Sequence, residues 1–280
     1  LSGLRNRQIY HAFLMQPDGS RVDPVSMRGG KIRFREIGPE SVLVLQYEST
    51  RRRSSMLSGL VEGTFWFEGT DLYSHQSRYT LAMARPDLSP RFTVLGPAPS
   101  RSETTQGDIR VWSFRRDKVA PSVMERNAQA AWRTRSQVRF TTMESWDPYV
   151  NWVRDLFRQS SKVTPKVASK AAELVVGLLT SEAKIDAVYR YAVEEIQYEQ
   201  DYARVIEGWE PHLPDQVLDR RYGDCKDKTM LIVTMLSSLG IQAHPALIRT
   251  WSLGGLDRKL PGSQFNHAVV YLPVQNGLET

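Results

Sequence analysis

The stretch "RRYGDCKDKTMLIVTMLSSLGI" (residues 220–241) holds the only cysteine of the 280-residue chain. Cys225 follows Gly223 by two residues and precedes the apolar run at residues 229–236. A cysteine that serves only as a small buried hydrophobe belongs inside such a run. Cys225 instead lies at its edge, among charged residues, and this position favours a reactive thiol over a structural one.

The residues around Cys225 carry the signals of a helix start. Asp224 fits the N-cap position, and Asp227, three residues later, fits the reciprocal position of a capping box. Gly240 is the residue type that most often follows the end of a helix. The sequence therefore predicts a helix that begins at Cys225 and stops at Gly240.

A thiol at the first position of a helix has free backbone N–H groups and the positive end of the helix dipole beside it. Both stabilise a thiolate. Asp224 and Asp227 oppose this effect, and Lys226 and Lys228 partly offset them. Because these effects on the thiolate largely cancel, a nucleophilic Cys225 needs a general base.

Five histidines are candidates for that base. His11 and His75 lie in a strand-like region without further context, whereas His212 precedes the cysteine in a loop and His244 opens a strand. His267 begins the apolar run "HAVVYLP", which is typical of a strand that packs beside a helix. We favour His267 and keep His212 and His244 as alternatives.

The hydrophobic periodicity divides the chain near residue 158. Residues 8–139 contain many short runs with strand-like alternation, separated by turn clusters such as "PDGSRVDP". This pattern predicts an antiparallel β-sandwich over residues 1–158, with a binding role. The helical period that follows predicts an α+β domain over residues 159–280, which carries Cys225 and His267.

Within the second domain, the apolar spacing predicts a helix after Thr180 or Ser181 whose buried face holds Ile185, Val188, Tyr189, Ala192 and Ile196. A short helix is expected near residues 214–220, and strands are expected near residues 243–251 and 265–273. Residues 158–170 are interpreted as a polar linker or a loosely helical connector, and residues 252–264 as a flexible, glycine-rich connector.

The composition excludes several classes. Hydrophobic residues make up 41% of the chain and charged residues 24%, as in ordinary globular proteins, and no apolar run is long enough to span a bilayer. The net charge is +6, but the densest basic run, Arg51–Arg53, has no aromatic residues beside it, so nucleic-acid binding is not expected. No ligand cluster suggests a metal, and no cofactor motif is present.

Three blocks of the sequence resemble the core of bacterial transglutaminase-like domains, within the papain-like thiol superfamily. They are the Gly-Asp-Cys-Lys-Asp block, the helix that ends in Gly-Ile, and the Phe-Asn-His block at residues 265–267. The resemblance covers residues 181–273. The β-rich half is similar to an uncharacterised domain that often precedes these domains.

The resemblance implies that Cys225 is the nucleophile and His267 the general base. It also implies an orienting acid from the next strand, which would lie beyond Thr280; Glu279 is the only acid after His267 in this chain, and a core truncated at its C-terminal end is one interpretation. A periplasmic or extracytoplasmic location is implied by the resemblance alone.

An oxyanion needs donors beside the thiol. The backbone N–H of Cys225 is the natural first donor, and the side-chain candidates are Gln197, Tyr198 and Tyr222. Trp209 is either a wall of the acyl groove or a packing residue. The sequence does not choose among these alternatives.

Two function classes follow. One is thiol-dependent hydrolysis or acyl transfer at amide bonds of a protein or peptide, with peptidase or amidase activity favoured over cross-linking by the resemblance. The other is a non-catalytic peptide- or protein-binding module that retains the fold. Neither requires a cofactor, and the oligomeric state stays open.

Overall fold

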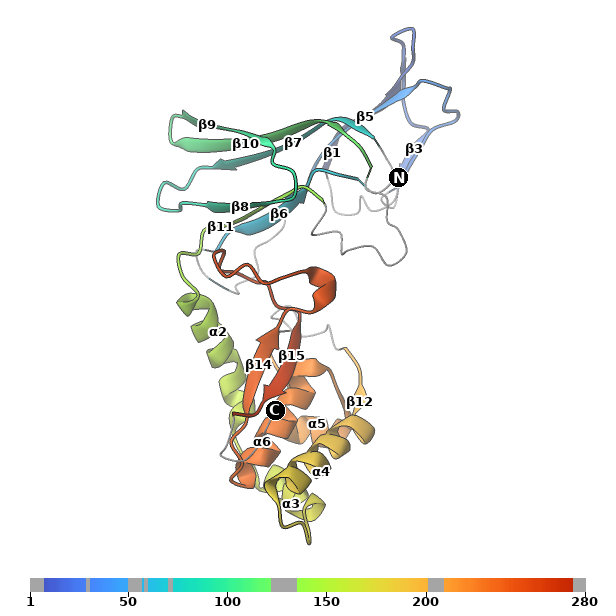
Figure 1. Cartoon of the computed structure of the whole chain (residues 1–280). Coiled ribbons are helices and arrows are strands. Elements are labelled where there is room, and N and C mark those ends of the chain that lie inside the picture. Colours follow the sequence, from blue (N-terminus) through green and yellow to red (C-terminus); the bar gives the residue numbers. More distant parts are fainter. Residues whose placement is uncertain are drawn as a thin grey trace. The chain divides into compact units, whose positions relative to one another are not determined.

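The computed structural model describes residues 8–28, 31–49, 57, 60–69, 73–121, 135–200 and 209–273 (Figure 1). The chain divides into two compact units, Leu1–Ser54 and Ser55–Thr280. The basic run at residues 51–53 and Glu279 lie outside the described residues. No helix in the part of the chain that the structure describes is long and apolar enough to cross a membrane.

The regular elements in the described residues of the first unit are β-strands. Three strands form an antiparallel sheet in the order β2-β1-β5, and a hairpin pairs β3 with β4. Its small core contains the buried side chains of Ala12 and Ile32. The strands are β1 (Gln8–Met15), β2 (Arg21–Val22), β3 (Ser26–Arg28), β4 (Lys31–Arg33) and β5 (Val42–Glu48).

The second unit begins with two antiparallel three-stranded sheets, in the orders β7-β10-β9 and β6-β11-β8. Alternate residues of their strands enter a common aromatic core that includes Phe67, Trp112, Phe114 and Val138. The strands are β6 (Glu62–Trp66), β7 (Ser74–Met83), β8 (Arg91–Leu95), β9 (Ser100–Gln106), β10 (Ile109–Val119) and β11 (Gln137–Thr141).

One position in these sheets requires glycine. Gly63 lies opposite Phe140 in the β6–β11 pair, and a Cβ at residue 63 would come within 2.6 Å of the Phe140 ring. The antiparallel sheets predicted for the β-rich region are confirmed. The sandwich arrangement and the domain boundary near residue 158 stay predictions.

The remainder of the second unit is helical with short strands (Figure 1). The helices are α2 (Asp147–Arg158), α3 (Pro165–Leu174), α4 (Ser181–Glu194), α5 (Pro214–Arg220) and α6 (Cys225–Ser238), with 3-10 turns η1 (Gln159–Ser161) and η2 (Trp251–Leu253). The strands are β12 (Gln197–Tyr198), β13 (Tyr222–Gly223), β14 (His244–Ile248) and β15 (His267–Tyr271).

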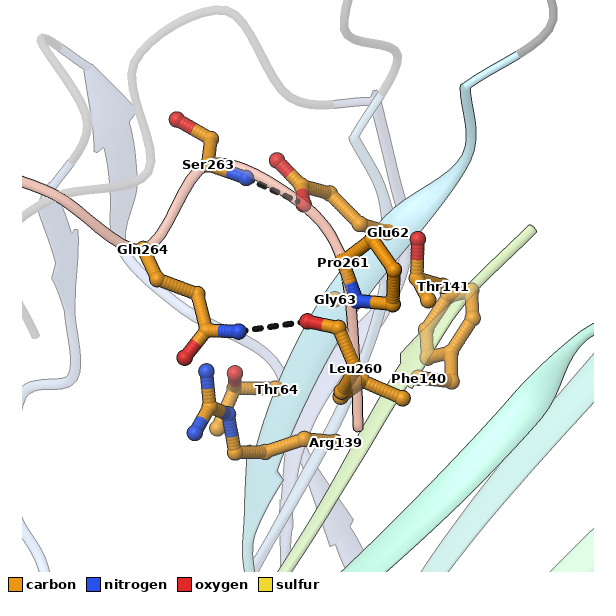
Figure 2. A pocket seen from close by; sticks show the side chains of 10 residues that line it. All are labelled: Glu62, Gly63, Thr64, Arg139, Phe140, Thr141, Leu260, Pro261, Ser263 and Gln264. Carbon is orange, nitrogen blue, oxygen red and sulfur yellow. Dashed lines mark hydrogen bonds between the residues drawn. The ribbon is translucent and has the colours of Figure 1, made fainter. Parts of the chain in front are cut away.

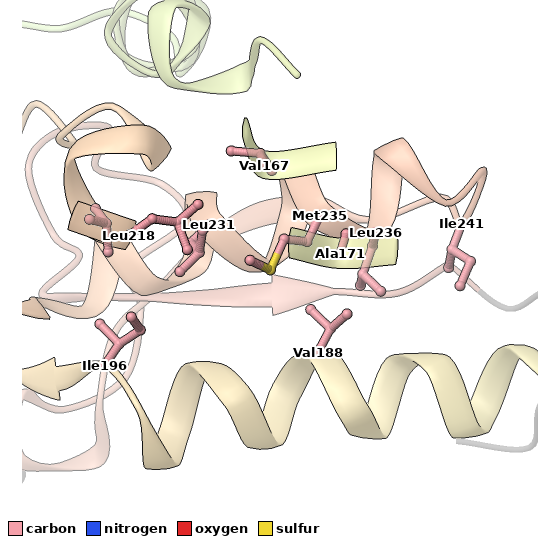
Figure 3. Close-up of a cluster of buried hydrophobic side chains, with 10 residues drawn as sticks. Val167, Ala171, Val188, Ile196, Leu218, Leu231, Met235, Leu236 and Ile241 are labelled. Atoms are coloured by element: carbon pink, nitrogen blue, oxygen red, sulfur yellow. The ribbon is translucent and has the colours of Figure 1, made fainter. Parts of the chain in front are cut away.

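Helix α6 supplies the centre of the second hydrophobic core (Figure 3). Its apolar side chains contact residues of α3, α4 and α5, and the helices therefore bury one another. The buried members are Val167, Ala171, Val188, Ile196, Val217, Leu218, Leu231, Met235, Leu236 and Ile241. This packing fixes the helix whose first residue is Cys225.

Two sequence expectations about the helices need correction. Of the two alternatives for residues 158–170, a linker or a loosely helical connector, the structure has the helical one, because α3 begins there, with Thr164 as its cap and Val167 fully buried. Tyr189 was expected on the buried face of α4, but 55% of it is exposed. The buried stripe is narrower than predicted, because Val188 and Ala192 fill it.

Truncation of the α6 core tests this packing. Leu231→Ala removes a fully buried side chain, so we expect a loss of about 2–5 kcal/mol in the free energy of unfolding. Leu179→Ala is the matched control, because that leucine is 94% exposed and its truncation changes stability by about 0.5 kcal/mol or less. Urea unfolding followed by circular dichroism measures both; equal effects would contradict the assignment of the core.

Candidate functional site

The first turn of α6 has the capping box that the sequence predicts. The Asp224 side chain accepts hydrogen bonds from the backbone N–H groups of Lys226 (3.1 Å) and Asp227 (3.5 Å). Asp227 in return accepts from the backbone N–H of Asp224 at 3.2 Å. Cys225 is therefore the first helical residue, and its side chain is only partly buried.

Asp227 also holds the loop before α5. Its carboxylate accepts a hydrogen bond from the backbone N–H of His212 at 2.8 Å and lies 3.1 Å from Nδ1 of the same residue. Asp227 is 1% exposed and His212 is 6% exposed. A carboxylate acceptor keeps a proton on Nδ1. His212, an alternative base in the sequence, is thus bound to the helix through Asp227.

The two lysines beside the thiol have other partners. Lys226 is buried and forms an ion pair with Asp224. The Nζ of Lys228 donates to the backbone carbonyl of Ile196 at 2.8 Å, and burial lowers the pKa of Lys228. Each lysine therefore stabilises the start of α6 through a specific contact, Lys226 with Asp224 and Lys228 with Ile196, and also adds positive charge.

A short parallel strand pair lies next to the thiol. β12 pairs with β13, so that Gln197 is opposite Tyr222 and Tyr198 is opposite Gly223. The pKa of Tyr198 is raised, first by burial and then by the negative charges of Cys225 and Asp224 and by a hydrogen bond with the thiol. Among the described interactions, Tyr198 is the donor candidate that bonds to Cys225.

Trp209 takes part in an aromatic contact. Its ring lies 5.9 Å from the ring of Trp152 on α2, at an angle of 63°. This contact supports the packing interpretation of Trp209 over the groove interpretation.

His267 opens β15, which pairs with β14 in an antiparallel hairpin that packs against α6. His267 is paired with Ile248 and is partly buried. The preceding Asn266 fixes this end of the hairpin, because it donates to Thr250 Oγ1 at 2.7 Å and accepts from the Thr250 backbone N–H at 2.9 Å. His244 lies at the other end of the hairpin, where its Nε2 is 3.1 Å from Nε2 of Gln242.

The loop before His267 is held by two polar side chains. Arg249 donates to the backbone carbonyls of Leu253, of Gly254 at 2.9 Å and of Gln264 at 2.6 Å. The Gln264 side chain is 4% exposed and bonds to the backbone of Asp257 and Leu260. The flexible connector predicted for residues 252–264 is therefore internally bonded.

The same loop contacts elements from earlier in the chain. The backbone N–H of Ser263 donates to Glu62 on β6 at 2.9 Å, and the indole of Trp146 donates to the carbonyl of Arg258 at 2.9 Å. Phe265 packs against Trp146 and Tyr149. The sequence carries no signal for these contacts, because their partners lie more than 100 residues apart.

Groups of histidine, cysteine and acidic residues that could hold a metal ion are not found among the described residues. The roles predicted for Cys225 and His267, and their pairing, stay predictions.

Asp227 is tested through stability. Asp227→Ala leaves the backbone N–H groups of His212 and Asp224 without their acceptor in a buried site, so we expect a loss of at least about 2 kcal/mol in the free energy of unfolding. Asp219→Ala is the control: it breaks an exposed ion pair with Lys166, which is worth about 1 kcal/mol or less. A loss for Asp227→Ala no larger than the control, in urea unfolding, would be inconsistent with its buried bonds.

Comparison with known proteins identifies the helical part. Residues 168–275 match the family model described as the transglutaminase-like superfamily. None of the curated proteins compared with the chain matches it.

Two solved structures are similar. One is a "putative protease" from Parabacteroides distasonis, with 12% identity, a TM-score of 0.67, and coverage of 94% of this chain and 54% of that one. The chain thus spans about half the length of this neighbour. The other is a "putative cysteine protease" from Cytophaga hutchinsonii, with 11% identity, a TM-score of 0.33, and coverage of 75% of this chain and 70% of that one. Residues 168–275 thus match the transglutaminase-like superfamily, and they follow a β-rich N-terminal region with antiparallel sheets.

Proposed function

We propose that the chain carries out thiol-dependent chemistry on amide bonds of a peptide or protein, with Cys225 as nucleophile and His267 as general base. The observation that carries the proposal is the partly exposed thiol at the first position of α6, with Tyr198 beside it. Activated thiols occur in such positions, where the helix end stabilises the thiolate.

The chain path supports the choice of His267. After α6 ends, a connection of five residues leads into β14, and β14 and β15 both pack against α6. A strand that returns along the helix brings its far end, Ile248, toward the start of α6. His267 is paired with Ile248, and this pairing supports a position for His267 toward the Cys225 end of the helix. His244 opens β14 and is left at the opposite end.

The reaction begins when His267 accepts the thiol proton and the sulfur of Cys225 attacks the amide carbonyl carbon. The C=O electron pair moves to oxygen, and the oxyanion accepts hydrogen bonds from the Cys225 backbone N–H and the Tyr198 hydroxyl. The raised pKa keeps Tyr198 protonated at neutral pH, as a donor must be.

The intermediate collapses when the C–N bond breaks and His267 gives its proton to the leaving amine. This leaves a thioester on Cys225. Water, deprotonated by His267, then attacks the thioester and releases the carboxylic acid and the thiol. An amine in place of water gives transamidation, and we favour hydrolysis on the family resemblance.

Reactivity of the thiol tests the pair. We expect iodoacetamide at neutral pH to alkylate Cys225 faster than free cysteine, and His267→Ala to remove that advantage. His244→Ala is the matched control and should react as the wild type. Mass spectrometry of the alkylated peptide gives the rates.

In hydrolysis of a mixed peptide library, Cys225→Ala should abolish turnover and His267→Ala should lower it by about 10²–10⁴-fold. Alkylation no faster than free cysteine, together with full activity of Cys225→Ala, would overturn the proposal and leave the binding-module alternative.

Tyr198 is tested by removal of its hydroxyl. Tyr198→Phe should lower kcat by about 10²-fold with little change in KM, because the hydroxyl bonds to the substrate only once the oxyanion develops, and bonds to the thiol before that. Tyr189→Phe, an exposed tyrosine on α4, is the control and should leave kcat unchanged. An unaltered kcat for Tyr198→Phe would exclude this role.

A further inference from the structure

A second site lies apart from Cys225, where loop 257–264 covers strands β6 and β11. The cavity there has a volume of about 180 Å³ (Figure 2). This is about the volume of six water molecules, which suits a small molecule better than a folded partner. Polar side chains face it, among them Glu62, Thr64, Arg139, Thr141, Ser263 and Gln264.

The strand register explains why polar groups gather here. Arg139 is paired with Thr64, and Thr141 is paired with Glu62, so these four side chains share one face of the β6–β11 pair. Val138, on the opposite face, enters the aromatic core. Every residue of β11 is buried, which is unusual for the sequence "QVRFT". Loop 257–264 lies over this polar face and makes a partly enclosed polar site, in which the β11 residues are buried and Glu62 and Thr64 stay exposed.

Arg139 is the buried cation of this site. It is 9% exposed, and among the described residues no hydrogen bond or ion pair within bonding distance holds its guanidinium. Burial lowers its pKa, and the negative charges of Asp257 and Glu62 act in the opposite direction. The guanidinium of Arg249 lies nearby. Its pKa is also lowered, first by burial and then by the positive charge of Arg139. Asp257 and Glu62 offset part of this buried charge through space, but neither forms an ion pair with Arg139 among the described residues, so the guanidinium can still bind an anionic group.

Glu62 provides the opposite charge. Its Oε2 accepts the backbone N–H of Ser263 at 2.9 Å, and burial raises the pKa of the carboxyl group although part of the side chain reaches solvent. Glu62 and Arg139 are diagonal neighbours across the strands, a relation with a typical Cα separation of about 7–8 Å. Within the described residues no ion pair joins them, and in Figure 2 they approach the cavity from different sides.

The other wall of the cavity is already fixed. Gln264 bonds to the backbone of Asp257 and Leu260, and Arg249 bonds to the carbonyl of Gln264. Gly262 allows the close approach to β6, since a Cβ there would lie 2.2 Å from Glu62 Oε2. A cavity with a bonded wall needs little rearrangement to receive a ligand.

We propose that this cavity binds the zwitterion of a free α-amino acid, with the carboxylate on Arg139 and the ammonium group on Glu62. Arginine binds carboxylates through two parallel hydrogen bonds, which gives both charge and orientation. The hydroxyls of Thr64 and Ser263 supply further polar contacts at the walls. The site uses no residue of the Cys225 machinery, so it stands independently of the proposed activity.

Calorimetric titration of the full 280-residue chain tests the ligand class. Glycine, alanine, leucine and phenylalanine would be compared with propionate, ethylamine and alaninamide at the same ionic strength. We expect at least one amino acid to bind at least tenfold more tightly than each of the three single-charge compounds. Binding of propionate as tight as that of the best amino acid, or no binding by any amino acid, would overturn the proposal.

Variants then assign the two charges. Arg139→Lys keeps the positive charge but not the paired geometry, and Glu62→Gln keeps the size but not the charge; each should weaken amino-acid binding at least tenfold. Arg115→Gln, an exposed arginine of β10, is the control. Thermal unfolding checks that each variant is folded. Unchanged amino-acid affinity in both folded variants would contradict the proposed site. If a variant fails to fold, the comparison of ligands on the wild-type chain tests the proposal.

Discussion

The carboxylate of Asp227 joins the two segments that meet at the start of α6. It accepts one hydrogen bond from the helix N-cap and one from the backbone of His212, and it lies beside the His212 ring, all in a site that water barely reaches. A Cβ at residue 223 would lie 2.7 Å from the Asp227 Cβ, so this approach requires Gly223. The position of the thiol follows from these contacts, because Cys225 lies between the two capping aspartates.

The same hydrogen bonds explain how the start of α6 is rigid while the thiol of Cys225 stays partly exposed. The aspartates and Lys226 are buried and bonded, whereas Cys225 between them stays partly open. Exposure of the thiol is therefore achieved without loosening the helix, whose later residues lie in the central core. In the proposed reaction, a thiol held in this way does not need to be ordered again when substrate binds, which lowers the entropic barrier to attack.

Much of the local structure near the thiol could be predicted from the sequence. The cap at Asp224, the reciprocal acceptor Asp227 and the stop at Gly240 act within a few residues, and the structure has all three. The strands that contain His244 and His267 were predicted for the same reason, from an apolar run with clear boundaries.

The features that could not be predicted depend on distant partners. Nothing near Ser263 reveals that its N–H binds Glu62, which lies 201 residues earlier. The polar residues of β11 would be expected to face solvent from the sequence alone. Arg139 is buried because loop 257–264 lies over this face of the strand. The bonds of Arg249 and Gln264 likewise converted a glycine-rich connector into a fixed wall.

Loop 257–264 leads through Phe265 and Asn266 directly to His267, so the proposed amino-acid site and the proposed base share one segment. A ligand shifts a conformational equilibrium only as far as it binds one state better than another. Here Arg249, Gln264 and the Asn266–Thr250 bonds already hold the segment in one arrangement. Occupation of the cavity therefore has little to change at His267, and the chemistry of the cavity fits fixed recognition of a small molecule better than a switch.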